Sequence, residues 1–459
     1  MFEKWKEEKI FLVLALIFGL LIVFLVPPVM SPDEDSHIKK IYSITKGRIL
    51  PIKSNNKLGN YFPKEMLDYI TYMKDYIGKS KNNYDYNFYV SNYNAKLKKN
   101  NEVFNDYSTA NTNIFVYIPQ VLAILFFKII TFKSISIGNY FYLGRIGNLL
   151  SYIFLIYNAI KKLPFSKKLM LFISLMPMSI YLGSSLNYDA VLIGISFFAI
   201  SYILNLIYSR DVKITKKDFY LFVFLSYFLL EFKFVYFPIV LLIFLVPKEK
   251  LKDKKWILFL KIFLGVLVLK IIYNIIFKTG VSGLLVEKKM ILSQIYFILR
   301  HPIKYIIILY NTYNLNKDYY ITSFVGNFGW LDTPMNILFS IFYMGLLVFI
   351  SNFETRVINI KSKIYIFGIS IFIYLLMFTS MYITWTTNWG IGYKAVEGVQ
   401  GRYFIPFSFL ILILFNLKIT KMIKLKKETI KTIKFYILPS LLLFSLVFSC
   451  LTIFIRFWI

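Results

Sequence analysis

The sequence predicts an all-α integral membrane protein that crosses the bilayer many times. Of its 459 residues, 58% are hydrophobic and 19% aromatic, and the mean hydropathy is +0.60, which no ordinary soluble domain reaches. The apolar residues form segments of about twenty, the length of a helix that crosses roughly 30 Å of hydrocarbon. Short lysine-rich loops separate these segments. We therefore expect one integral membrane domain, residues 1–459, with roughly 10 to 13 transmembrane helices.

The lysine-rich loops also predict the orientation, because loops rich in Lys and Arg stay on the cytoplasmic side. They lie at 161–168, 210–217, 248–255, 356–363 and 418–427, and residues 1–9 resemble them. We expect a cytoplasmic N-terminus and a location in the bacterial plasma membrane. The net charge of +30 is then a topology signal, and nucleic acid is not an expected partner. One cysteine and two histidines exclude an internal disulfide and a His-rich metal site.

Most spans can be placed directly on the sequence. They are expected at 10–30, 169–187, 189–208, 256–278, 335–351, 364–384, 403–417 and 434–456. The first is read as a retained helix, because no small-residue cleavage site follows it.

Three further regions are ambiguous. Residues 112–160 hold two apolar stretches, 114–130 and 137–160, where the charge rule allows one net crossing. Either one stretch is interfacial, or the loop 161–168 departs from the rule. Two short segments, 219–230 and 234–246, predict a hairpin of short helices around Glu231-Phe232-Lys233. The run 291–312 carries Arg300, His301 and Pro302 in its middle, which favours a re-entrant or surface helix.

One large hydrophilic segment, 31–113, is predicted to be an extracytoplasmic loop subdomain. An amphipathic helix is expected at 32–46, with Ser31 as N-cap, Pro32 in the first turn, and Glu34 completing a capping box with Ser31. This helix is expected to lie on the membrane beside the first span.

The start of that loop, Ser31-Pro32-Asp33-Glu34-Asp35-Ser36-His37, holds three adjacent carboxylates. One interpretation is structural, since anions in a first helical turn gain about 0.3–1 kcal/mol each from the macrodipole. The other is catalytic, because a carboxylate at the edge of a cavity can act as general base on a sugar or lipid hydroxyl. Asp33 and Glu34 are the catalytic candidates. His37 shares a helix face with Asp33 and is a candidate for substrate contact.

Other polar positions are predicted to reach the same outer face. They are Asp189 in 183–189, Trp330 and Asp332 in 326–333, Gln400 and Arg402 in 397–406, and Lys233 at the bend of the short hairpin. The guanidinium fork of Arg402 suits a phosphate, and snorkelling at the interface is the alternative. Lys233 is a second candidate cation, with a pair to Glu231 or a turn role as alternatives.

Several motifs together carry a family resemblance. The segments PDEDSH, KGRILP, MPMSIYLGSSLNYDA, EFKFVYFP, FVGNFGWLDT and GVQGRYFIP, in that order, resemble the bacterial membrane family named domain of unknown function 2142, over nearly the whole chain. That family is similar to the glycosyltransferase C superfamily, which takes sugars from polyprenyl-phosphate donors at the outer side of the membrane. The resemblance implies a glycosyltransferase-C-like fold, a catalytic Asp33 or Glu34, and Arg402 as a ligand of the donor phosphate.

The expected function is therefore a membrane glycosyltransferase that moves a sugar from a polyprenyl-phosphate carrier to a cell-envelope glycan, lipid or protein. The expected partners are membrane lipid, the lipid-linked donor and the envelope acceptor. A transporter or flippase of a lipid-linked glycan, and a non-catalytic subunit of an envelope-polymer assembly, are the alternatives. No cofactor is expected, although Asp33, Glu34, Asp35 and Asp189 could supply the oxygens for Mg²⁺.

Overall fold

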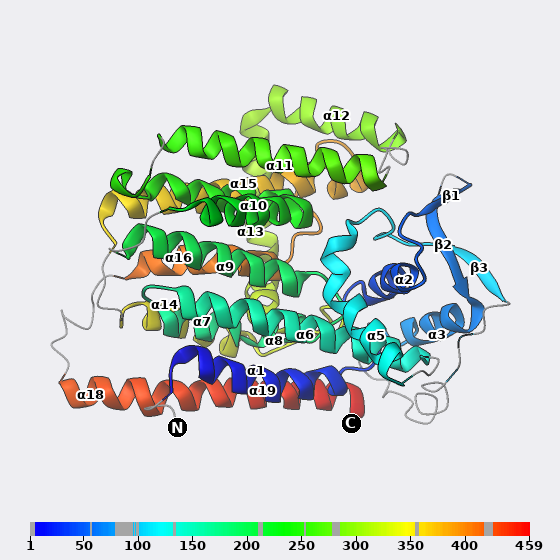
Figure 1. The fold of residues 1–459 in the computed structure, drawn as a ribbon, viewed down its shortest axis with the longest axis horizontal. Helices are drawn as coiled ribbons and strands as arrows, with labels where there is room; N and C mark the ends of the chain where they lie inside the picture. Colours follow the sequence, from blue (N-terminus) through cyan, green and yellow to red (C-terminus); the bar gives the residue numbers. More distant parts are fainter. Residues whose placement is uncertain are drawn as a thin grey trace.

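A computed structural model of the chain describes residues 5–55, 57–78, 95, 97, 101–131, 135–209, 214–251, 254–277, 285–353, 358–416 and 426–459. This part is mostly helical, which confirms the expected helical membrane class. Most of the long helices run side by side, whereas α13 (Pro302–Val325) lies at 105° to α12 (Leu285–Arg300) and crosses the bundle (Figure 1). Strands β1 (Ile52–Ser54), β2 (Lys57–Pro63) and β3 (Glu102–Asp106) gather with α2 (Glu34–Thr45) and α3 (Lys64–Lys74) at one end of the bundle. We name this the loop end and the opposite end the lysine end.

The bundle consists of α1 (Glu7–Leu25), η1 (Ile114–Tyr117), α5 (Ile118–Thr131), α6 (Ile137–Lys162), α7 (Lys167–Ser174), α8 (Pro177–Gly183), α9 (Asp189–Tyr208), α10 (Lys216–Lys233), η2 (Phe234–Leu245), η3 (Lys248–Lys250), α11 (Lys255–Phe277), α12 (Leu285–Arg300), α13 (Pro302–Val325), α14 (Ile337–Ser351), α15 (Ile360–Ile383), η4 (Trp385–Trp389), η5 (Gly401–Phe404), α16 (Ile405–Leu412), η6 (Ile413–Phe415), α18 (Lys427–Thr432), η7 (Ile433–Ile437) and α19 (Leu438–Trp458).

Eight helices of the described part are long and apolar enough to cross a bilayer, or up to nine if one bent pair is a single span. This number is below the expected 10 to 13, because several expected spans form shorter pieces. The segments Ile337–Ser351 and Gly401–Phe415 are apolar helices below full spanning length. The expected span 169–187 is divided into α7 and α8 just before Pro177, which has no backbone N–H to continue a helix.

Two of the ambiguous regions form the bends that their residues predict. The backbone N–H of Ile214 donates to the carbonyl of Lys250 at 3.3 Å, so the start of α10 and the end of η2 meet and the segment is a hairpin. By length and composition alone, Lys216–Leu245 counts as one span. The hydrogen bond between Ile214 and Lys250 shows instead that the two ends of this segment lie together. Helices α12 and α13 meet at 105° around His301. Both stretches of 112–160 form helices of spanning length, Ile114–Thr131 and Ile137–Lys162.

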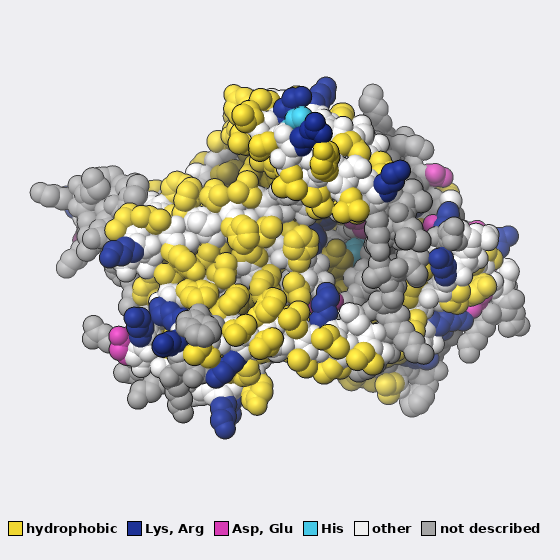
Figure 2. Space-filling model, turned by 90° about the horizontal axis from the view of Figure 1, so that it is seen from above, with side chains coloured by type: hydrophobic (Ala, Val, Ile, Leu, Met, Phe, Trp, Pro, Cys, Tyr) yellow, Lys and Arg dark blue, Asp and Glu magenta, His cyan; other side chains and the backbone are white. Residues whose placement is uncertain are grey.

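The outer surface of the helices is apolar. Side chains such as Phe126, Ile275 and Leu299 are 67–75% exposed, and Figure 2 shows hydrophobic side chains covering most of one broad face. A contiguous apolar face of this size would drive aggregation in water and is the surface that lipid tails cover.

The lysine-rich segments lie together at the lysine end, as expected if these loops are all on one side of the membrane. Lys250 Nζ donates to the carbonyl of Leu206 at 2.7 Å, and Lys363 Nζ donates to that of Leu414 at 2.9 Å. These lysines therefore lie at helix ends, where cations offset the macrodipole. Parts of the lysine-rich loops, 210–213, 252–253, 356–357 and 418–425, lie outside the described residues.

The loop end contains a small sheet that the all-α prediction did not include. Strands β1 (Ile52–Ser54), β2 (Lys57–Pro63) and β3 (Glu102–Asp106) form an antiparallel sheet in the order β1-β2-β3, and α3 (Lys64–Lys74) follows β2. Two-residue strands β4 (Asn327–Phe328) and β5 (Thr333–Pro334) form a second pair.

Helix α2 (Glu34–Thr45) corrects two expectations. It does not lie on the membrane, because ten of its twelve residues are buried among α5, α6 and β2. The capping box is also wrong. Asp33 is the N-cap in a left-handed conformation, with φ of 61°, and makes no capping hydrogen bond. The Ser31 hydroxyl instead donates to Ser185 Oγ at 3.1 Å, because the loop end surrounds this turn with polar partners that a surface helix would lack.

Candidate functional site

The centre of the candidate site is Arg402 in η5. The preceding Gly401 allows η5 to lie directly on α13, because a Cβ at this position would stand 2.1 Å from the Tyr320 carbonyl oxygen. The Gly401 N–H also donates to Ser323 Oγ at 2.8 Å. The glycine therefore determines the position of Arg402 at the loop end.

The guanidinium of Arg402 contacts Gln400, Asp189 and Asp33, and it lies 5.6 Å from the centre of the Tyr403 ring. Its Nε donates to Gln400 Oε1 at 2.5 Å, its Nη1 is 3.4 Å from Asp189 Oδ2, and its Nη2 is 3.8 Å from Asp33 Oδ2. The Arg402 side chain is 5% exposed, whereas that of Asp33 is 56% exposed. Both carboxylate distances exceed the usual N–H···O range, so these ion pairs are loose.

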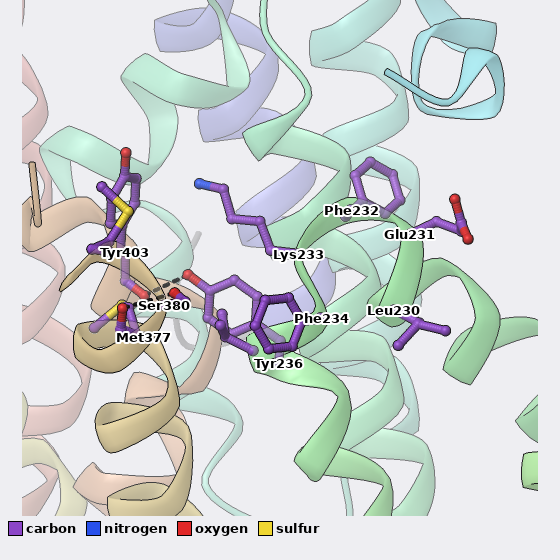
Figure 3. Close-up of a pocket in the computed structure, with 11 residues that line it drawn as sticks. Leu230, Glu231, Phe232, Lys233, Phe234, Tyr236, Met377, Ser380 and Tyr403 are labelled. Atoms are coloured by element: carbon purple, nitrogen blue, oxygen red, sulfur yellow. Dashed lines mark hydrogen bonds between the residues drawn. The ribbon is translucent and has the colours of Figure 1, made fainter. Parts of the chain in front are cut away.

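Lys233 supplies a second cation from the bend between α10 and η2. Its Nζ is 3.5 Å from Asp189 Oδ1 and lies 3.9 Å from the centre of the Tyr403 ring. Figure 3 shows the Lys233 side chain pointing toward Tyr403, while Glu231 points to the other side of the bend. Glu231 pairs with Lys270 at 3.0 Å, so the alternative pairing of Lys233 with Glu231 does not occur.

A pocket of about 340 Å³ opens beside Lys233 and Tyr403. Figure 3 shows its walls, which come from the α10–η2 bend, α15 and η5 and include Leu230, Phe232, Phe234, Val235, Tyr236, Met377, Ser380 and Met381. The walls are mainly apolar, and they include the charged side chains of Lys233 and Glu231. Figure 2 shows a hollow near the loop end, bordered by cationic and anionic side chains.

His37 lies on the buried side of this cluster. Its Nδ1 is 2.7 Å from the Tyr117 hydroxyl, and its ring meets the edge of the Tyr188 ring. Burial lowers the pKa of His37, although the nearby Asp33 and Asp189 carboxylates act in the opposite direction. Tyr117 thus holds the His37 ring beside the cluster, and the lowered pKa favours the neutral imidazole.

Glu34 belongs to a separate, closed arrangement. Its carboxylate receives Nε and Nη2 of Arg145 at 2.8 and 2.7 Å and the backbone N–H of Leu186 at 2.9 Å, and both charged side chains are fully buried. Arg145 also donates to the carbonyls of Val23, Val26 and Pro27. Both carboxylate oxygens of Glu34 therefore accept hydrogen bonds, and the pair with Arg145 links the α1–α2 connection to α6.

Trp330 and Asp332 lie apart from the Arg402 cluster in the contacts of the described residues. Asp332 Oδ2 is 3.2 Å from Arg456 Nη2 of α19 and accepts from the Gly78 N–H at 3.1 Å. Trp330 Nε1 donates to the carbonyl of Val29 at 2.7 Å. These two residues connect the loop after α13 to the ends of α1 and α19.

The structure thus joins Asp33, Asp189, Lys233, Gln400 and Arg402 and places His37 against them. Arg145 was missed by sequence reasoning, although an arginine inside the apolar stretch 137–160 is a signal of a buried partner. Tyr403 was missed as well, and no signal distinguishes it in a chain with 36 tyrosines.

The carboxylates considered for Mg²⁺ are not brought together. Glu34 faces Arg145, and Asp35 pairs with Lys74 at 2.8 Å, which leaves Asp33 and Asp189 toward Arg402. Within the described ranges, no group of three or more His, Cys, Asp or Glu side chains is arranged to hold a metal ion.

The helical bundle, its apolar surface and the ionic cluster at one end define a polytopic membrane protein. The chain belongs to the DUF2142 family, described as predicted membrane protein, whose family model matches residues 16–411. This match confirms the family that the sequence motifs indicate. No curated protein and no solved structure matches the chain.

Proposed function

We propose that this protein is a glycosyltransferase-C-like membrane enzyme that moves a sugar from a polyprenyl-phosphate carrier to a cell-envelope glycan, lipid or protein. The observation that carries the proposal is the solvent-exposed carboxylate of Asp33, 3.8 Å from the buried guanidinium of Arg402. Transfer of a sugar from a phosphate ester to a hydroxyl is favoured by a base that can reach the hydroxyl and by a cation that stabilises the leaving phosphate.

Asp33 is the proposed general base and Glu34 is not. A base must come within hydrogen-bond reach of the acceptor hydroxyl. Asp33 has an exposed carboxylate, whereas both oxygens of Glu34 are occupied in a fully buried pair. The left-handed backbone at Asp33 turns this residue out of the helix that Glu34 begins, and such strain at a non-glycine residue is common at functional sites.

Arg402 and Lys233 are the proposed ligands of the donor phosphate. The separation of Arg402 from Asp33 is long for a hydrogen bond, so a phosphate can replace Asp33 on the guanidinium and free the base. In the reaction, the acceptor oxygen bonds to the anomeric carbon while the carbon–oxygen bond to the phosphate breaks. The hydroxyl proton goes to Asp33, and the electron pair leaves on the lipid phosphate beside Arg402 and Lys233.

The donor is proposed to be a monophosphate used without a metal ion. Two cations stand near the site, and together they can balance the charge of one lipid phosphate, whereas a diphosphate leaving group usually needs a divalent ion as well. Transfer by the purified protein should survive EDTA. Activity lost in EDTA and restored by Mg²⁺ or Mn²⁺ would overturn this part of the proposal.

The reaction is proposed to occur on the outer face of the bacterial plasma membrane, with the N-terminus and the lysine end in the cytoplasm. Single cysteines at Lys57 and Glu249 in a Cys450→Ser background test this orientation, since both positions are exposed. Labelling of position 57 alone is expected when a membrane-impermeant maleimide is added to intact cells. Labelling of position 249 instead would reverse the topology.

The decisive experiment supplies purified protein with lipid-phosphate-linked sugars and follows sugar transfer by mass spectrometry, alongside the envelope glycans of cells with and without the protein. Transfer that is lost in Asp33→Asn supports the proposal. Movement of an intact lipid-linked glycan across a proteoliposome membrane without bond cleavage would replace it with a transporter or flippase. Unchanged envelope glycans with no transfer would leave a non-catalytic assembly subunit.

A further inference from the structure

A second, polar pocket lies next to Arg402, because its lining includes Gln400, which accepts from Arg402 Nε. It measures about 230 Å³ and is lined by Asn316, Tyr319, Tyr320, Val396, Glu397, Gly398, Val399 and Gln400. We call it the Glu397 pocket. We infer that this pocket binds the sugar ring of a lipid-phosphate-linked donor, an inference that rests on the proposed function.

Gln400 connects the pocket to the phosphate site. It lines the pocket, and its Oε1 accepts from Arg402 Nε at 2.5 Å. The Nη2 and Nη1 atoms of the same guanidinium face Asp33 and Asp189. In a lipid-phosphate sugar, the anomeric carbon is bonded to a phosphate oxygen, so the sugar must occupy a pocket that directly adjoins the phosphate ligand. The Glu397 pocket meets this condition.

The lining supplies hydrogen-bonding groups that suit several hydroxyls. Within the described residues, the Glu397 carboxylate and the Gln400 amide nitrogen have no hydrogen-bond partner, and both belong to the pocket lining. Asn316 uses its amide nitrogen on the Thr312 carbonyl at 3.1 Å, which leaves its oxygen as an acceptor. A carboxylate can accept from two neighbouring hydroxyls at once, and hydrogen bonds to a charged group are about twice as strong as neutral ones.

The loop that carries Glu397 is held in place on both sides. The N–H of Val396 donates to Thr312 Oγ1 at 2.7 Å, and the N–H of Glu397 donates to Thr386 Oγ1 at 2.9 Å. Gly398 has φ of +81°, and a Cβ there would stand 2.5 Å from Trp385. Anchors on α13 and η4 therefore pre-organise the pocket, which lowers the entropy cost of binding a polar ring.

A larger apolar pocket shares the wall formed by Tyr320. It measures about 610 Å³, lies between α13, α14, α15 and α16, and includes Phe324, Leu347, Phe404, Ile411 and Phe415. Its lining is mainly apolar, although Tyr313, Lys317, Tyr374 and Ser408 also belong to it, so it suits a hydrocarbon chain better than a sugar ring. Tyr320 lines both the polar and the apolar pocket, beside Arg402. A polar pocket, a cation and an apolar pocket close together match the sugar, the phosphate and the hydrocarbon chain of the donor.

The test measures binding to the full-length protein in nanodiscs. The probes are geranylgeranyl methyl phosphate, which has no sugar, and geranylgeranyl phosphodiesters of glucose, galactose, mannose and arabinofuranose, which carry the same charge. We expect at least one sugar-bearing probe to bind the wild type about tenfold tighter than the methyl ester. Glu397→Gln and, separately, Asn316→Ala should lose this advantage and keep wild-type affinity for the methyl ester, which also shows that they are folded.

Matched variants separate this inference from the proposed function. Arg402→Lys should weaken all probes, and Glu249→Gln, an exposed acid at the lysine end, should weaken none. If the methyl ester binds in an Arg402-dependent way and no sugar improves it, or if Glu397→Gln keeps the sugar advantage, the inference is overturned and the phosphate site stands. If no probe shows Arg402-dependent binding, the proposed function itself fails.

Discussion

Asp33 and Glu34 are neighbours in the chain, but they belong to two opposite kinds of ion cluster. Glu34 is fully buried against Arg145, with short contacts of 2.7–2.9 Å to two guanidinium nitrogens and one backbone N–H. Asp33 is 56% exposed, and its carboxylate is 3.8 Å from Arg402 Nη2. The same guanidinium is 3.4 Å from Asp189. We call the Glu34–Arg145 pair closed, because its groups bond to one another, and the cluster of Asp33, Asp189, Lys233 and Arg402 open.

The difference indicates which charges are available to a ligand. A buried ion pair is tolerated only when its partners satisfy one another, and Arg145 meets this condition with Glu34 and three backbone carbonyls. The ion pairs of the Arg402 cluster are long, and the cluster borders two pockets, through Tyr403 and Gln400. A closed pair stabilises the fold, whereas an open cluster can exchange one partner for a bound anion.

The largest effect is expected from breaking the closed pair. Arg145→Met should leave the Glu34 carboxylate buried without its cation and cost about 3–5 kcal/mol of folding free energy. Fluorescence-detected size-exclusion chromatography should show most of the folded protein lost. The double variant Arg145→Met, Glu34→Gln should recover part of it, because no charge then remains buried. Full folding of the single variant would contradict the structural role.

The next effect is catalytic and concerns the open cluster. Asp33→Asn should reduce sugar transfer by about 10²–10⁴-fold, because it removes the general base. Folded protein should be recovered at the wild-type level, since the Asp33 side chain makes no capping hydrogen bond. Mass-spectrometric rates of transfer measure the effect. Near-normal transfer by Asp33→Asn would remove it from the reaction.

A smaller effect is expected from a change of geometry at constant charge. Arg402→Lys keeps the cation but loses the fork, and donor affinity should fall about tenfold or more. Arg456→Lys is the matched control, because Arg456 is also a buried arginine beside an aspartate, Asp332, outside the Arg402 cluster. Equal donor affinity in wild type and Arg402→Lys would show that Arg402 is structural, like Arg145.

The last expected effect is a pH dependence of stability from α2. Burial lowers the pKa of Lys40 from 10.5 to about 8, and its Nζ donates to the Ala110 carbonyl at 2.7 Å. Between pH 8 and 10.5 the unfolded chain binds this proton and the folded chain does not, so stability should rise with pH there. The slope is at most about 1.4 kcal/mol per pH unit, the value for one proton. Thermal unfolding of wild type and Lys40→Met measures it, and identical slopes would contradict the assignment.

Patterns that depend on nearby residues were predictable from the sequence. The 20-residue helix α9 follows the apolar run 189–208, and the bend at His301 follows from Pro302 and its charged neighbours. Lys233 at a hairpin bend was predicted from two short apolar runs, and the meeting of Ile214 with Lys250 confirms it. Each of these features results from hydrophobicity, chain length or proline within one segment.

Local sequence patterns are enough to predict the membrane class, the family, the positions of most helices and a set of polar candidates. The folded protein divides those candidates into two groups, because the environment of a charge depends on residues far away in the chain. Glu34 is closed by Arg145, 111 positions later, whereas Asp33 is left open opposite Arg402. Burial and distance decide whether a carboxylate stabilises a fold or faces a ligand, and no local pattern encodes either quantity.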